Sequence, residues 1–203
     1  MSSTMKEEFY TQKRWLNWMN KVKESNFKLT ESDDKSSGAV FIYIMDDVVL
    51  ACLKVIARSE REIISTEEAL AEIEAIRSIV FNDHESLGED ADLMIESLKT
   101  SLEAVFVSSQ RYITGSFDRE SPIERLVAMA MAAEDEGDLD KAFDLLSQVG
   151  ARVIGGESIP EIGELPYCMT AELMDGIDAI SAAMIGEDSY KNEDGSEDSE
   201  END

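Results

Sequence analysis

The sequence has few of the residues that build disulfides, zinc sites or nucleophilic relays: two cysteines and one histidine among 203 residues. Cys52 and Cys168 lie far apart, which gives neither a disulfide framework nor the paired ligand spacing of a zinc site. His84 has no Ser-x-Gly motif or cysteine beside it. Because there are only three prolines and no long Gly/Ser linker, we expect a single domain.

Positive charge is also scarce, because 18 Lys and Arg stand against 45 Asp and Glu and the formal net charge is −27. Binding to duplex nucleic acid and to anionic membrane surfaces depends on cations. We therefore expect no membrane partner, and nucleic acid is disfavoured. The acidity fits solubility, a basic partner or a salt-rich cytoplasm, and the sequence leaves all three open.

An uninterrupted apolar run of membrane-spanning length is missing as well. The longest apolar stretch, residues 39–57, holds Asp46 and Asp47 near its centre. A central Asp costs about 2.5–3.5 kcal/mol on membrane-insertion scales, so we interpret the stretch as a buried helix of a soluble protein. The first ten residues include Glu7 and Glu8 and do not resemble a signal peptide. With so few cysteines, a cytoplasmic location is expected.

What the sequence does contain is a basic, aromatic beginning on an acidic chain. Residues 1–30 hold six cations and three acids, a net of +3, so residues 31–203 carry −30. Both tryptophans, Trp15 and Trp18, lie in this basic part. Such a segment is expected to bind something acidic, and the nearest acidic surface is the rest of the same protein.

We predict a helix over about residues 7–25, with Trp15 and Trp18 on one apolar stripe and Arg14 and Lys21 on the opposite side. Two interpretations stay open. The helix is either a lid whose tryptophans are buried and whose cations pair with the acidic body, or a segment that binds a partner. In the second case these four residues are the candidate partner-binding residues.

The fold is predicted to be all-α, because apolar residues recur with helical period almost everywhere and no hairpin dipeptide is flanked by alternating strands. We expect one bundle of about seven helices over residues 1–186. A short run at 40–44 is rich in β-forming residues and could be a strand. The expected helices cover about 7–25, 40–59, 66–80, 90–113, 122–136, a segment that begins at Asp138, and one that begins near Thr170.

Local signals predict several helix ends. Ser65 and Glu68 have the spacing of a capping box, and Ser121 before Pro122 reads as an N-cap. Gly137 separates two helices that form an αα-hairpin, and residues 130–146 resemble one tetratricopeptide-type helical pair. Only one copy is present, so neither a solenoid nor a peptide groove is inferred. Residues 187–203 carry nine acids and one lysine and are predicted to be disordered.

Asp46 and Asp47 are the polar pair of the central helix. Helical spacing puts Asp47 on a polar stripe with Tyr43 and Lys54, and Asp46 about 100° away on a face expected to be packed. A buried carboxylate needs a partner, so we predict that Asp46 forms a cap or pairs with a cation of the first helix. The alternative is a metal ligand or a general base.

One enzymatic alternative is a magnesium-dependent helical nucleotide pyrophosphohydrolase, whose metal ligands are acids spaced along facing helices. Glu89 with Asp92 has one such spacing, and Glu68 with Glu72 only approximates another. In a chain with 45 acids these spacings are expected on solvated helix faces. Gly155-Gly156 lacks the Lys-Ser/Thr end of a phosphate loop. The sequence thus predicts no catalytic residue, metal or cofactor.

Residues 10–18 (YTQKRWLNW) and 45–56 (MDDVVLACLKVI) resemble an uncharacterised family of archaeal, largely methanogen, proteins known as a domain of unknown function. The resemblance extends over residues 7–185. It implies a cytoplasmic archaeal protein and supplies no catalytic residue. Our expectation is therefore a non-catalytic protein that acts by association with a protein partner or with itself. A nucleic-acid-associated regulator is the third alternative, after the hydrolase.

Overall fold

The computed structural model describes residues 8–29, 35–160 and 168–185, and these form seven α-helices and no strand. This confirms the all-α prediction. The helices are α1 (Gln12–Ser25), α2 (Lys35–Glu60), α3 (Thr66–Phe81), α4 (Glu89–Thr114), α5 (Ile123–Asp135), α6 (Leu139–Ile154) and α7 (Met169–Ile185). Within the described ranges, no helix combines the length and the apolarity needed to cross a membrane.

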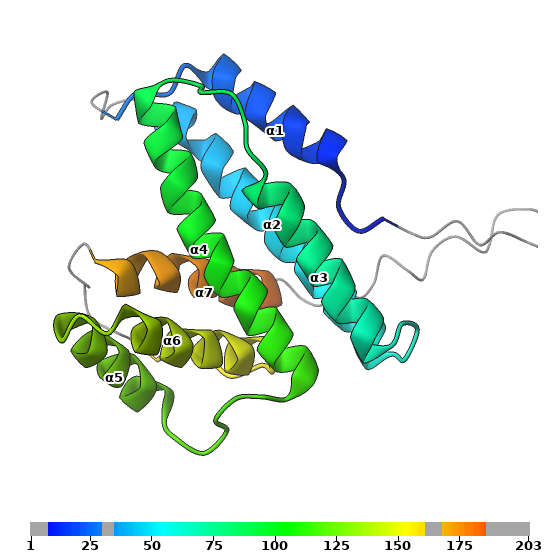
Figure 1. Cartoon of the computed structure of the whole chain (residues 1–203), viewed down its shortest axis with the longest axis vertical. Coiled ribbons are helices and arrows are strands. Elements are labelled where there is room, and N and C mark those ends of the chain that lie inside the picture. Colours follow the sequence, from blue (N-terminus) through cyan, green and yellow to red (C-terminus); the bar gives the residue numbers. More distant parts are fainter. Residues whose placement is uncertain (1–7, 30–34, 161–167, 186–203) are drawn as a thin grey trace, which may run out of the picture.

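Helix α4 is the central element of the bundle, because it packs against α2, α3, α6 and α7. Figure 1 shows α1, α2 and α3 as one group of helices against part of α4, and α5, α6 and α7 as a second group against the rest. The side chains of Leu102 and Phe106 on α4 are fully buried. One continuous apolar core therefore joins both groups.

Several predicted helix ends are confirmed. The Ser65 hydroxyl accepts a hydrogen bond from the Glu68 N–H at 3.2 Å, and the Glu68 carboxylate accepts one from the Ser65 N–H at 2.8 Å. A cap of this kind stabilises a helix by about 1 kcal/mol. Gly137 has φ of 80°, as the turn between α5 and α6 requires, and Asp138 caps α6 through the Lys141 N–H.

Two local predictions change. Residues 40–44 belong to α2, which begins at Lys35, because burial of Phe41 and Ile44 in the helical core outweighs their β-propensity. Ser121 is not the cap of α5, whose cap position is held by Pro122. The Ser121 side chain and N–H instead bond the Asp118 carboxylate, and these contacts lower the pKa of Asp118 to about 2.

The predicted αα-hairpin forms, since α5 packs against α6, and α6 also packs against α4 and α7. Its likeness to a tetratricopeptide unit stays a prediction. The predicted disordered segment, residues 187–203, lies outside the described residues.

Two glycines set how closely the second group of helices approaches α4. A Cβ atom placed on Gly150 of α6 would lie 2.1 Å from Ser108 Oγ, and one on Gly176 of α7 would lie 2.2 Å from the backbone oxygen of Ser101. Real Cβ atoms do not approach other heavy atoms so closely. Both crossings therefore depend on the missing side chain.

Candidate functional site

Helix α1 lies on α2 (Figure 1), and the side chains of its apolar stripe are buried. Trp15 is 1% exposed, and Met19 and Val22 are also buried. Thr11 caps the helix by accepting a hydrogen bond from the Arg14 N–H at 3.1 Å. Trp15 is therefore buried, as the lid interpretation expects, whereas Trp18 is only partly buried.

Asp47 is the polar centre of this contact. Its carboxylate accepts hydrogen bonds from Arg14 Nε at 2.9 Å and from Trp18 Nε1 at 2.7 Å, and a further one from Arg14 Nη2. The Asp47 side chain is 14% exposed, whereas the Arg14 side chain is 48% exposed. The two helices are thus joined by a half-buried, two-pronged ion pair with an indole as a third donor.

Arg14, Trp18 and Lys21 form a row along one flank of α1. The Lys21 Nζ lies 4.1 Å from the Trp18 ring centroid, and the Arg14 guanidinium lies 5.2 Å from the ring of Tyr10. The prediction that Arg14 and Lys21 lie opposite Trp18 is therefore wrong. Residues four and seven positions apart return to the same side of a helix.

Tyr10 is the buried residue of this cluster, in contact with Arg14. Its side chain is buried beside Asp47, and burial, followed by the negative charge of Asp47, raises the pKa of the Tyr10 hydroxyl. The hydroxyl consequently stays neutral.

The roles predicted for the two aspartates are exchanged in the structure. Asp47, not Asp46, pairs with a cation of the first helix, and Asp46 is exposed. Neighbouring protein atoms still raise the pKa of Asp46 by desolvation. The prediction fails because α1 docks on the Asp47 side of α2, and this choice is made by packing between the helices.

Beside this cluster the molecule exposes an aromatic side chain. Tyr43 precedes Asp47 by one helical turn and is 59% exposed. The edge-to-face contact of Phe27 with Phe41, at 5.0 Å between centroids, shows that the end of α1 lies beside the start of α2. The two helices are therefore antiparallel (Figure 1). We call the side chains of Trp18 and Lys21 on α1, with those of Tyr43 and Asp46 on α2, the α1–α2 face.

Of the four predicted partner-binding residues, three are thus used within the protein. Trp15 is in the core, and both Arg14 and the indole N–H of Trp18 are bound to Asp47. Trp18 is partly exposed and Lys21 is exposed.

Two carboxylates of the hydrolase alternative, Asp92 and Glu68, have structural partners. Asp92 accepts hydrogen bonds from the Ser86 hydroxyl and from the Leu87 N–H, which fasten the turn before α4 and lower the pKa of Asp92. Glu68 belongs to the capping box of α3. Among the described residues, no group of three or more His, Cys, Asp and Glu is arranged to hold a metal.

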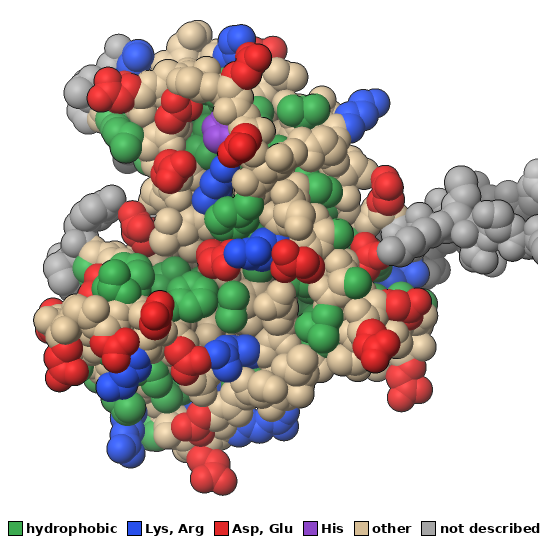
Figure 2. Space-filling model, in the orientation of Figure 1, with side chains coloured by type: hydrophobic (Ala, Val, Ile, Leu, Met, Phe, Trp, Pro, Cys, Tyr) green, Lys and Arg blue, Asp and Glu red, His purple; other side chains and the backbone are tan. Residues whose placement is uncertain are grey.

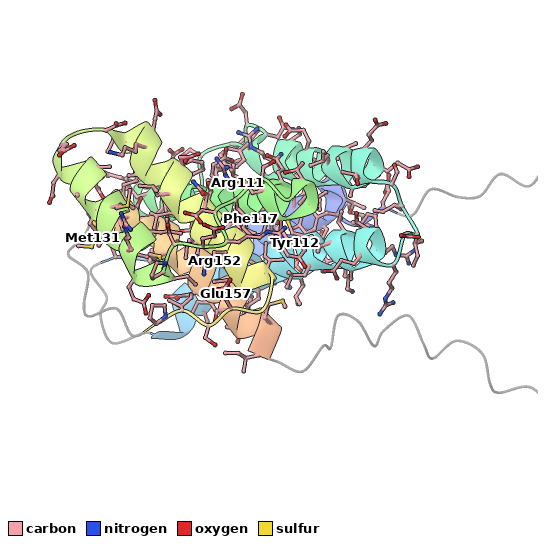
Figure 3. All side chains as sticks on the ribbon, turned by 90° about the horizontal axis from the view of Figure 1, so that it is seen from below. Arg111, Tyr112, Phe117, Met131, Arg152 and Glu157 are labelled. Carbon is pink, nitrogen blue, oxygen red and sulfur yellow. The ribbon has the colours of Figure 1, made fainter. Side chains whose placement is uncertain are left out.

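A second candidate, which the sequence did not indicate, is a cleft of about 530 Å³ at the other end of the bundle. The ends of α2, α4 and α6, the start of α3 and the α4–α5 connection meet there. Figure 3 shows Tyr112, Phe117, Arg152 and Glu157 gathered in this region. These residues come from separate segments with no common motif, so only the folded chain brings them together.

Comparison with known proteins gives a family and no activity. No curated protein and no solved structure matches this chain. A family model described as "Uncharacterized protein conserved in archaea (DUF2150)" matches residues 8–193, which includes both segments that carried the resemblance and extends eight residues past its expected end at residue 185. The chain belongs to this archaeal family.

Proposed function

We propose that the protein acts without catalysis, as a cytoplasmic adaptor or regulator that binds a basic protein through the α1–α2 face. The observation that carries the proposal is Tyr43, a large aromatic side chain that is 59% exposed. It lies one helical turn before Asp47, which binds Arg14 and Trp18 of α1. Tyr and Trp are, with Arg, the residue types that dominate binding energy at protein interfaces.

Charge supports a basic partner. The net charge of −27 gives an attractive long-range field for cations. Figure 2 shows Asp and Glu side chains scattered over the visible face, interspersed with Lys and Arg side chains and with groups of apolar side chains. The positive charge of Arg14 on helix α1 is already balanced within the protein, because Arg14 is bound to Asp47. Within the α1–α2 face, Asp46 is the exposed carboxylate for a partner's Lys or Arg, and Tyr43 offers the apolar contact.

The proposal is tested with a partner captured from an extract of the source archaeon by tagged full-length protein, and then purified. The affinity of wild type is compared with that of the double variant Tyr43→Ser/Asp46→Lys by calorimetry. Leu139→Ser/Asp140→Lys is the matched control, because it changes an exposed apolar residue and its exposed acidic neighbour on α6. We expect about tenfold weaker binding for the first variant and no change for the control.

The dependence of the binding affinity on salt concentration is the second readout. Affinity should fall between about 0.1 M and about 1 M NaCl, since the Debye length shortens from about 10 Å to about 3 Å. Equal affinity of both double variants, or affinity independent of salt, contradicts the proposal. Light scattering tests whether the partner is a second copy of the chain. In that case wild type and the control variant form a dimer, and the Tyr43→Ser/Asp46→Lys variant does not.

A further inference from the structure

The cleft at the end of α4 has the size and lining of a site for a small molecule. Its volume of about 530 Å³ lies within the range of about 300–1,000 Å³ found for ligand pockets. Ile56, Ile113 and Phe117 give it apolar walls, and the Tyr112 and Phe117 rings stack at 6.4 Å with an interplanar angle of 19°. An apolar or aromatic body of a ligand would therefore be accommodated.

Two of the four charges that line the cleft neutralise each other. The buried Arg152 donates to the Glu157 carboxylate through Nε at 2.9 Å and Nη2 at 2.6 Å, and its Nη1 donates to the Ser121 carbonyl. The two-pronged pair lowers the pKa of Glu157. The charges of this pair therefore cancel within the lining of the cleft.

The other two charges have no opposite charge beside them. Among the described residues, neither Glu60 nor Arg119 has an oppositely charged partner. Glu60 Oε1 accepts a hydrogen bond from the Tyr112 hydroxyl at 2.6 Å, and the Arg119 guanidinium lies 4.7 Å from the centroid of the Phe117 ring. Since Tyr112 and Phe117 are stacked, one pair of rings supports both the carboxylate and the guanidinium.

We propose that this cleft binds a small zwitterion with an apolar or aromatic body, of the amino-acid or short-peptide type. Its carboxylate pairs with Arg119, its ammonium group pairs with Glu60, and its body lies against Phe117 and Ile113. A ligand with both charges satisfies both unpaired groups at once, whereas an anion would leave Glu60 unpaired and a cation would leave Arg119 unpaired. The site is separate from the α1–α2 face and independent of the proposed association.

The test uses matched probes that differ by one charge at a time: L-phenylalanine, 3-phenylpropionate, which lacks the ammonium group, and phenethylamine, which lacks the carboxylate. Comparison of L-alanyl-L-phenylalanine with L-phenylalanine shows whether the cleft prefers a short peptide or a free amino acid. Binding to the full-length, isotope-labelled protein is followed by NMR shifts of the amides of Phe117 and Gly155, which both line the cleft. We expect at least one zwitterion to bind about tenfold more tightly than both singly charged probes.

Two variants assign the charges. Arg119→Gln should weaken binding of the zwitterion by about tenfold and leave binding of phenethylamine unchanged. Glu60→Gln should also weaken binding of the zwitterion by about tenfold, but it should leave binding of 3-phenylpropionate unchanged. A general structural loss would instead weaken all probes equally. Arg125→Gln on α5 is the control, because Arg125 is exposed outside the cleft. The proposal is overturned if no zwitterion is preferred, or if the preference survives in both cleft variants.

Discussion

Asp47 shows how much a single carboxylate contributes when it receives three donors. Arg14 supplies two of its hydrogen bonds and Trp18 the third, and the carboxylate is 14% exposed. Removing its charge leaves a guanidinium and an indole N–H competing for one amide oxygen. Asp46, one residue earlier, is exposed. Adjacent aspartates on one helix are therefore expected to differ strongly in their effect on stability.

Asp47→Asn should lower the free energy of unfolding by about 1–2 kcal/mol, a moderate value because solvent screens the half-exposed Arg14. The loss is measured by urea unfolding, followed by the combined fluorescence of Trp15 and Trp18. Asp46→Asn is the control and should stay within about 0.5 kcal/mol of wild type. Equal losses in the two variants would argue against Asp47 as the anchor of α1.

At the scale of helices, the close crossings of α6 and α7 with α4 depend on glycine. The obstacle differs between them, because Gly176 faces a backbone carbonyl of Ser101 and Gly150 faces the side chain of Ser108. A side chain is removable by mutation and a backbone carbonyl is not. The two crossings should therefore respond differently to a compensating substitution.

Gly176→Ala should destabilise the protein by about 2 kcal/mol or more, despite the better helix propensity of alanine, because α7 must move away from α4. Gly38→Ala is the control. A Cβ on Gly38 would meet only Phe27 at 3.7 Å, an ordinary contact, so this change in α2 should be neutral or slightly stabilising. Thermal unfolding of the two variants checks the difference, and equal melting temperatures would contradict it.

Gly150→Ala should cost about 1–3 kcal/mol, and adding Ser108→Gly should recover part of that loss. The Ser108 hydroxyl is buried without a hydrogen-bond partner among the described residues, so its removal sacrifices no such contact. A double-mutant cycle measured by urea unfolding gives the coupling between the two sites. Simple additivity of the two single changes would show that the crossing relaxes in another way.

At the scale of the whole molecule, the net charge of −27 opposes compactness, while ion pairs such as Arg77–Glu103 and Arg152–Glu157 favour it. Salt weakens both effects. Self-repulsion acts over the whole surface, whereas Arg152 is buried and its pair is screened much less. The repulsion is therefore expected to decide the response to salt.

Raising NaCl from about 0.1 M to about 1 M should increase the melting temperature, because a Debye length of about 3 Å removes most repulsion between exposed carboxylates. Differential scanning calorimetry measures the shift, and KCl at the same ionic strength should give the same result. A fall in melting temperature would instead show that the ion pairs dominate.

Much of the architecture was predictable from local patterns. The helical period gave seven helices, Ser65 with Glu68 gave a capping box, and Gly137 gave the turn before α6. These predictions succeed because each depends on residues within about one helical turn of one another. Ser121 failed as a cap because a nearby loop carboxylate, that of Asp118, engages it instead.

The sequence by itself determined the helices, their apolar stripes and the strong acidity, because these follow from local periodicity and composition. Only the tertiary structure decided that Asp47 rather than Asp46 receives Arg14, that two glycines allow close crossings, and that Glu60 and Arg119 line one cleft. The physical reason is that a shift of one residue turns a helix by about 100°, so the face that meets a neighbour is fixed by packing between helices and not by the pattern of one helix.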